Sequence, residues 1–108
     1  MDVFTLKDKA AYQADKMAKV DLVSSPRMMA GLNCFEPGQV QKVHAHGGAD
    51  KLYYVVEGAG EFSVGDKKTT LKAGDMLHVP ENVDHGVVNT GSSRLAVLIV
   101  IAPNAHKK

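Results

Sequence analysis

Apolar residues follow two different spacings along this chain, one near the N-terminus and one over the rest of the sequence. In the N-terminal part, small apolar residues recur at three- and four-residue intervals among Lys and Asp, which is typical of one face of a helix. They are Ala10, Ala11, Ala14, Met17 and Ala18. From Met28 onward, short runs rich in Val, Tyr, Phe and Leu alternate with Gly and Pro. That alternation predicts an all-β region after one short helix or turn.

Each apolar run after Met28 is long enough for one strand. The predicted strands cover residues 27–35, 39–46, 51–57, 60–65, 68–72, 76–79, 85–89 and 94–101. Gly65-Asp66 predicts a tight hairpin turn, because glycine supplies the positive φ that such turns need. A parallel α/β sheet is excluded, because the segments between the runs are too short for crossover helices. Frequent turns between short strands predict a sandwich, a jelly roll or a small barrel.

Composition narrows the class of protein. The chain has 108 residues, which fit one domain, and a formal charge of +1 with interspersed signs. We therefore expect neither nucleic acid nor a membrane surface as a partner. The one cysteine, Cys34, has no partner for an internal disulfide and fits a small buried hydrophobe. The N-terminus does not resemble a signal peptide, and the longest apolar run is too short to span a bilayer. These features favour a cytoplasmic protein.

Three of the five histidines are candidate metal ligands. His44 and His46 are two residues apart in a predicted strand, so their side chains leave the same face, roughly 7 Å apart along the backbone. Both imidazoles then reach a common point. A His-x-His pair alone is weak evidence for metal binding, because two histidines at a strand end are also a common surface feature. His85 is the third candidate because of the spacing of the residues around it.

Two spaced motifs frame these histidines. In the first motif, five residues separate Gly38 from His44 and one separates His44 from His46. Four residues then separate His46 from Lys51, and six separate Lys51 from Gly58. In the second motif, five residues separate Gly74 from Pro80 and one separates Pro80 from Asn82. Two residues then separate Asn82 from His85, and three separate His85 from Asn89. Together, in this order, they resemble the two motifs of the cupin superfamily, with Lys51 at the usual glutamate position and Asn82 at a usual glycine. The resemblance covers residues 38–89 directly.

The resemblance implies a fold and a domain organisation. The fold is an all-β cupin-type barrel or jelly roll of two antiparallel sheets, with a pocket at one end and a short N-terminal helix or irregular segment. We accordingly expect an N-terminal extension over residues 1–25, a cupin barrel over 26–103 and a flexible tail over 104–108. His106 belongs to that tail. His78 lies outside the motif positions and is interpreted as a structural histidine.

The resemblance also implies that His44, His46 and His85 bind one divalent transition metal ion, with Fe, Ni, Zn, Mn and Cu all open. In the family a glutamate completes the site, whereas this chain has Lys51 there. A protonated amine does not ligate a cation, and its charge beside one is unfavourable. Three alternatives stay open. The three histidines hold the ion alone; a bulged connection turns Asp50 inward as a carboxylate ligand; or Lys51 faces the pocket, no metal binds, and its charge receives an anion.

Strand parity separates these alternatives. If Lys51 faces the pocket, Tyr53 and Val55 face it as well, whereas an inward Asp50 brings Tyr54 and Val56 inward. Lys51 and Tyr53 are the candidate catalytic residues, for proton transfer or for binding a substrate carboxylate. An aromatic residue that fills the barrel core is the plainer interpretation of either tyrosine.

The sequence thus predicts a small metal-binding cupin-domain protein that acts on a small molecule as an enzyme, of dioxygenase, isomerase or decarboxylase type. The alternative is a non-catalytic binding or sensing cupin, which also covers the metal-free case with Lys51 in the pocket. A chain of this length has open sheet edges and a limited core, so we also expect a homodimer.

Overall fold

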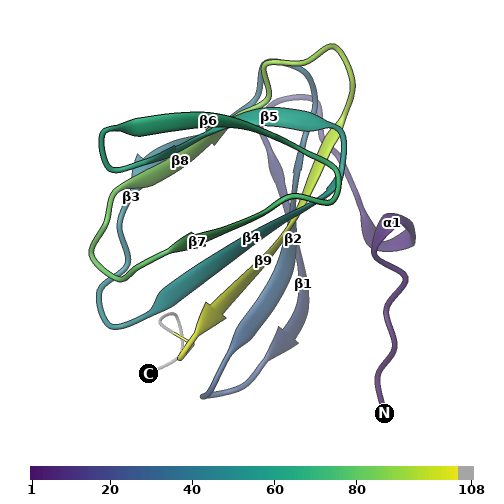
Figure 1. Cartoon of the computed structure of the whole chain (residues 1–108). Helices are drawn as coiled ribbons and strands as arrows, with labels where there is room; N and C mark the ends of the chain where they lie inside the picture. Colours follow the sequence, from purple (N-terminus) through teal and green to yellow (C-terminus); the bar gives the residue numbers. More distant parts are fainter. Residues whose placement is uncertain (105–108) are drawn as a thin grey trace.

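Two antiparallel sheets lie face to face and enclose the core (Figure 1). The structure is a computed structural model that describes residues 1–104. The predicted flexible tail, with His106, lies outside the described residues except for Asn104. Within the described part, a short helix α1 (Leu6–Lys9) precedes the strands. The all-β fold of two antiparallel sheets is confirmed.

The larger sheet has five strands in the order β1-β2-β9-β4-β7. Their bounds are β1 Ala18–Ser24, β2 Met29–Phe35, β9 Leu95–Ala102, β4 Asp50–Glu57 and β7 Met76–Val79. The smaller sheet has the order β3-β8-β5-β6. Its strands are β3 Val40–His44, β8 His85–Val88, β5 Ala59–Val64 and β6 Lys67–Lys72. Neighbouring strands are antiparallel throughout both sheets.

The core lies between the sheets. Its fully buried side chains come from both layers, and the largest are Tyr53, Phe35, Phe62, Leu95 and Ile101. Because side chains alternate along a strand, every second residue of β4 and β9 faces this core. Burial of these aromatic and branched side chains is the main stabilising term of the fold.

Each of the eight predicted strands is present, and its ends differ from the prediction by two residues or fewer. Gly65 has the predicted positive φ, 61°, in the turn between β5 and β6. The prediction fits well because Gly and Pro mark the ends of most strands.

The N-terminal segment differs from the prediction. The predicted helical stretch between Ala10 and Ala18 is not a helix, since α1 ends at Lys9 and residue 18 begins a strand. This strand, β1, pairs with β2 in the larger sheet. The expected N-terminal extension over residues 1–25 therefore contains the strand β1, which is part of the larger sheet. A short amphipathic run gains little as an isolated helix, and residues 10–17 form an irregular segment that leads into β1.

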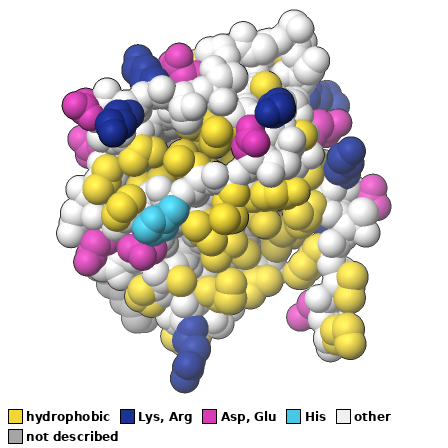
Figure 2. Space-filling view, viewed as in Figure 1, with side chains coloured by type: hydrophobic (Ala, Val, Ile, Leu, Met, Phe, Trp, Pro, Cys, Tyr) yellow, Lys and Arg dark blue, Asp and Glu magenta, His cyan; other side chains and the backbone are white. Residues whose placement is uncertain are grey.

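The outer face of the larger sheet carries a second hydrophobic cluster. Leu32, Cys34 and Ala96 are buried there, and Leu6 and Tyr12 of the N-terminal segment pack against them. Cys34 is thus the small buried hydrophobe that the sequence indicates. Hydrophobic side chains cover much of this face of the molecule (Figure 2). The structure describes a single chain, so the homodimer stays a prediction. No helix in residues 1–104 is long and apolar enough to cross a membrane.

Gly58 joins β4 to β5 and lies close to the backbone that leads into β9. Its φ is 82°, and a Cβ at this position would overlap the Arg94 carbonyl oxygen. Gly38 has nearly the same φ, 85°, but its Cβ would meet nothing within 4 Å. Alanine substitutions at Gly38 and Gly58 therefore distinguish the cost of backbone strain from the cost of steric overlap.

We expect Gly38→Ala to lower the free energy of unfolding by about 1 kcal/mol, from left-handed strain alone. Gly58→Ala should cost about 1–3 kcal/mol more, because the overlap forces the backbone to move. Urea denaturation of both variants measures the difference. Equal losses in the two variants would contradict the close approach at Gly58.

Candidate metal and anion site

The three predicted histidines converge at one end of the barrel. His44 ends β3 and His85 begins β8, and the two residues are partners across the β3–β8 ladder. His46 lies in the loop after β3. One nitrogen from each ring lies within 4.8 Å of the others. The ring centroids of His44 and His85 are 4.2 Å apart, and those of His44 and His46 are 4.9 Å apart.

A turn from the second motif holds the His46 loop in place. The backbone N–H of Asn82 donates to the carbonyl of His46 at 2.8 Å. Asn82 has a φ of 64°, which explains its place at a position where cupins usually carry glycine. Asparagine tolerates the left-handed region better than other residues with a Cβ. The substitution therefore keeps the turn that leads into His85.

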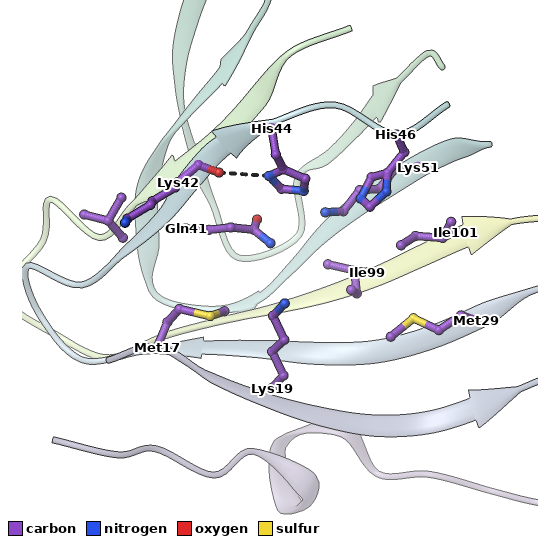
Figure 3. Close-up of a pocket in the computed structure, with 11 residues that line it drawn as sticks. Met17, Lys19, Met29, Gln41, Lys42, His44, His46, Lys51, Ile99 and Ile101 are labelled. Atoms are coloured by element: carbon purple, nitrogen blue, oxygen red, sulfur yellow. Dashed lines mark hydrogen bonds between the residues drawn. The ribbon is translucent and has the colours of Figure 1, made fainter. Parts of the chain in front are cut away.

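Backbone carbonyls fix the orientation of two of the imidazoles. Nδ1 of His44 lies 2.8 Å from the Lys42 carbonyl oxygen, as Figure 3 shows, and Nδ1 of His85 lies 3.0 Å from the Val83 carbonyl oxygen. A neutral imidazole that donates from Nδ1 carries its lone pair on Nε2. Burial lowers the pKa of His85 to about 4, which favours this neutral form. Metal-binding histidines commonly have this arrangement.

Lys51 faces these histidines from β4, in the opposite sheet. Its Nζ lies 3.4 Å from Nε2 of His85 and 4.7 Å from the centroid of the Tyr53 ring. Only 2% of the residue is exposed. Burial lowers the pKa of Lys51 to about 8, and the nearby charge of Lys19 acts in the same direction. The structure thus places an amine where the family usually has a carboxylate.

Asp50 does not join the cluster. Its Oδ2 lies 3.4 Å from Nε2 of His78, and both side chains are more than half exposed. Its Oδ1 accepts a hydrogen bond from the backbone N–H of Glu81 at 3.2 Å. The alternative with Asp50 as an inward ligand is therefore not the arrangement found. The reason is that β4 pairs with β9 without a bulge from Asp50 to Val55, so its side chains alternate regularly.

The parity argument places Tyr53 and Val55 correctly on the inner face, since both are fully buried. The Tyr53 hydroxyl donates to Oε1 of Gln41 at 2.9 Å, and burial raises its pKa. The Tyr53 ring packs edge-on against Phe62 at 5.2 Å. Tyr53 is thus a core residue whose polar end reaches the wall of the site.

His78, which the sequence indicates as a structural histidine, lies away from the site. Its side chain is 54% exposed and pairs with Asp50 on the outside of the barrel. It lies on β7 and outside the group of three histidines. The prediction that it lies outside the metal ligand set agrees with this placement.

Sequence reasoning missed two residues of the site. Gln41 lies three residues before His44, so regular alternation puts the two side chains on opposite faces. A bulge between them brings both to the pocket. Lys19 was missed because β1 was not predicted, and it extends into the pocket from the wall opposite His44 (Figure 3). Buried amide side chains need partners, so a glutamine in an apolar strand is the one available signal.

Two of the histidines, His44 and His46, line a cavity of about 360 Å³. Its wall includes the charged side chains of Lys19, Lys42 and Lys51, and no Asp or Glu is among the described residues that line it. Apolar residues, among them Met29 and Ile99, form much of the rest. A cavity lined with cations favours an anionic ligand.

Comparison of the chain with known proteins identifies its family and several relatives. The family described as "Cupin domain" matches residues 31–101. The chain is 31% identical over 88 residues to a Thermotoga maritima protein named "Oxalate-binding protein", a match that covers 82% of this chain and 72% of that one.

The solved structures that are similar to this chain include the two that follow. The TT1209 protein of Thermus thermophilus has a TM-score of 0.92 at 41% identity, over 95% of this chain and 98% of that one. A predicted oxalate decarboxylase of Thermotoga maritima has a TM-score of 0.74 at 24% identity, over 82% of this chain and 92% of that one. At that identity the second match shows the fold alone.

The buried amine predicts a pH-dependent stability. An unfolded lysine has a pKa near 10.5, whereas that of Lys51 in the fold is about 8. Between these values the unfolded chain binds more protons, so the free energy of unfolding rises with pH. Below about pH 8 the buried charge costs on the order of 3 kcal/mol.

We therefore expect Lys51→Met to raise the free energy of unfolding of the metal-free protein by about 1–3 kcal/mol near neutral pH. The gain should shrink as the pH approaches about 9.5, because wild-type Lys51 then loses its proton in the fold. Urea denaturation with a chelator present, from pH 7 upward, measures it. Lys68→Met on β6 is the exposed control. A gain that does not change with pH, or a loss, would contradict a buried charged amine.

Proposed function

Because this chain belongs to the cupin family, we propose that it is a metal-binding cupin that binds a small carboxylate beside a three-histidine divalent metal site. The observation that carries the proposal is the meeting of His44, His46 and His85 at a cavity whose charged side chains are lysines. The relative named an oxalate-binding protein supports a carboxylate as the ligand.

The donor set fits a transition metal ion. Imidazole nitrogens suit Fe, Ni, Zn, Mn and Cu alike, and two of the rings are oriented by backbone carbonyls. The ion would supply a Lewis acid that polarises a bound oxygen. Lys51 does not fit as a ligand while protonated, so the histidines alone are the proposed protein ligands.

The proposed role of Lys51 is to hold the carboxylate. Its ammonium group lies beside His85 and inside a cavity that excludes much of the solvent, where a charge-assisted hydrogen bond is strong. A bound carboxylate also offsets the desolvation of Lys51, because it supplies the opposite charge that the cavity lacks. For a reaction, Lys51 is the residue placed to give or take a proton at the ligand. Decarboxylase, isomerase and dioxygenase types all remain within the proposal.

Gln41 completes the polar wall. Because its Oε1 accepts from Tyr53, its amide nitrogen is directed away from the phenol. Gln41 lines the cavity, so we propose that its N–H donates to the ligand and that Tyr53 orients it. Tyr53 is then a positioning residue.

A second candidate function is metal-free anion binding. The contact between Lys51 Nζ and His85 Nε2 favours it, because one lone pair serves either a proton donor or an ion. In that case the ligand binds equally well after treatment with a chelator. Elemental analysis of the protein as purified, without a histidine tag, separates the two candidates.

We expect wild-type protein loaded with one of these ions and dialysed to retain about one ion per chain, from three histidine ligands. His85→Ala should lose most of it. His44→Ala should do the same, and it tests the site independently because His44 is only partly buried. His78→Ala is the control outside the cluster and should retain the ion. Equal metal content in all four proteins would overturn the metal site.

We expect Lys51→Met to weaken oxalate binding to the metal-loaded protein by about 10- to 100-fold, the worth of a hydrogen bond to a buried charge. Titration calorimetry measures this, with the metal content checked after each titration because free oxalate chelates metals. Oxamide, a neutral ligand of the same shape, should discriminate little between the two proteins. Unchanged oxalate affinity in Lys51→Met would contradict the proposed role of the amine.

A further inference from the structure

A second cavity continues the first one away from the histidines. It measures about 530 Å³ and shares four lining residues with the histidine cavity, namely Met17, Lys19, Val40 and Lys42. Gln13 and Lys16 complete its wall. Because the two cavities share these four residues, they adjoin, and together they form a groove that reaches from His44 and His46 to the N-terminal segment.

The groove has two cationic regions. Lys51 lies at the inner end, beside His85. Lys16, Lys19 and Lys42 surround the outer part, and none of the described residues that line either cavity is acidic. Close like charges repel one another, and an anion bound between them relieves that repulsion. The outer lysines therefore form a second place for a negative charge, separate from the one at Lys51.

Apolar side chains line the shared stretch of the groove together with Lys19 and Lys42. Met17 and Val40 line both cavities, and Ile99 lines the inner one. Methionine adapts its shape readily and packs well against a flexible hydrocarbon chain. Lys51 lines only the inner cavity and Lys16 only the outer one, so a groove with apolar side chains along it and cations toward both ends fits a ligand with an anionic group at each end and methylene groups between them. Oxalate has no such spacer.

We propose that the ligand of this protein is an extended dicarboxylate, with one carboxylate at Lys51 and the histidines and the other among Lys16, Lys19 and Lys42. This inference rests on the proposed function, because the first carboxylate is the one placed there. The combined space suits it, since pockets of about 300–1,000 Å³ hold molecules far larger than a two-carbon acid. Lys19 and Lys42 become specificity-determining residues for ligand length.

The test is a series of calorimetric titrations of the metal-loaded protein with oxalate, succinate, adipate and suberate, and with hexanoate as the matched monocarboxylate for adipate. We expect the affinity to rise along the series, and adipate or suberate to bind at least about tenfold more tightly than the matched monocarboxylate. Raised ionic strength should reduce this preference, because the outer lysines are exposed.

Variants locate the second carboxylate. Lys19→Met and Lys42→Met should each weaken adipate binding about three- to tenfold, the range for partly solvated charges, and weaken oxalate binding by a smaller factor, because both lysines also line the histidine cavity. Lys68→Met has the same charge change on β6 and should bind adipate like the wild type.

The outcomes separate this inference from the proposed function. If no carboxylate binds, both are overturned. If oxalate binds and the longer acids gain nothing over hexanoate, the extended ligand is overturned while the metal and anion site stands. If the length preference is present but unaffected by Lys19→Met and Lys42→Met, the outer lysines are not the second site and the inference fails.

Discussion

The site depends on one contact, between Nζ of Lys51 and Nε2 of His85, at 3.4 Å. The same imidazole nitrogen is the atom that a metal ion would use, so the amine and the ion address one lone pair. The contact exists because β4 runs without a bulge from Asp50 to Val55 and directs Lys51 inward. A register shift of one residue would bring Asp50 to the histidines and convert a cationic site into an acidic one. The chemistry of the pocket thus follows from the strand pairing of β4.

The two sheets contribute different chemistry. The smaller sheet and its loops supply the histidines and Gln41, whereas the larger sheet supplies Lys51 and Lys19. Backbone ladders fix each set within its own layer, and the packed core fixes the distance between the layers. Tyr53 connects them directly, since it belongs to β4 and donates to Gln41 on β3. A buried side chain that both fills the core and fixes a polar group is well suited to keep such a site in place.

Much of the fold was predictable because glycine and proline mark the strand ends and because two spaced motifs fix the histidines. What the sequence did not reveal has local causes. The Ala-rich stretch before Lys19 has helical spacing, but it is irregular and leads into the strand β1, which pairs with the otherwise open edge of β2. Because β1 was not predicted, the sequence did not indicate that Lys19 belongs to the barrel. Gln41 was missed because strand parity holds only in regular strands, and a bulge lies between it and His44.

The site has no acidic protein ligand among the described residues, and the lysines of the groove add further positive charge to it. In most cation sites a carboxylate offsets the charge of the ion, but here Asp50 lies outside and pairs with His78. A divalent ion on neutral histidines beside Lys51 leaves excess positive charge in a poorly solvated cavity, which is costly unless an anion is present. Ion and carboxylate should therefore stabilise each other's binding, and by linkage each raises the affinity for the other by the same factor. Under the proposed function, the ligand supplies the carboxylate that the protein lacks, so the bound anion should strengthen the binding of the ion.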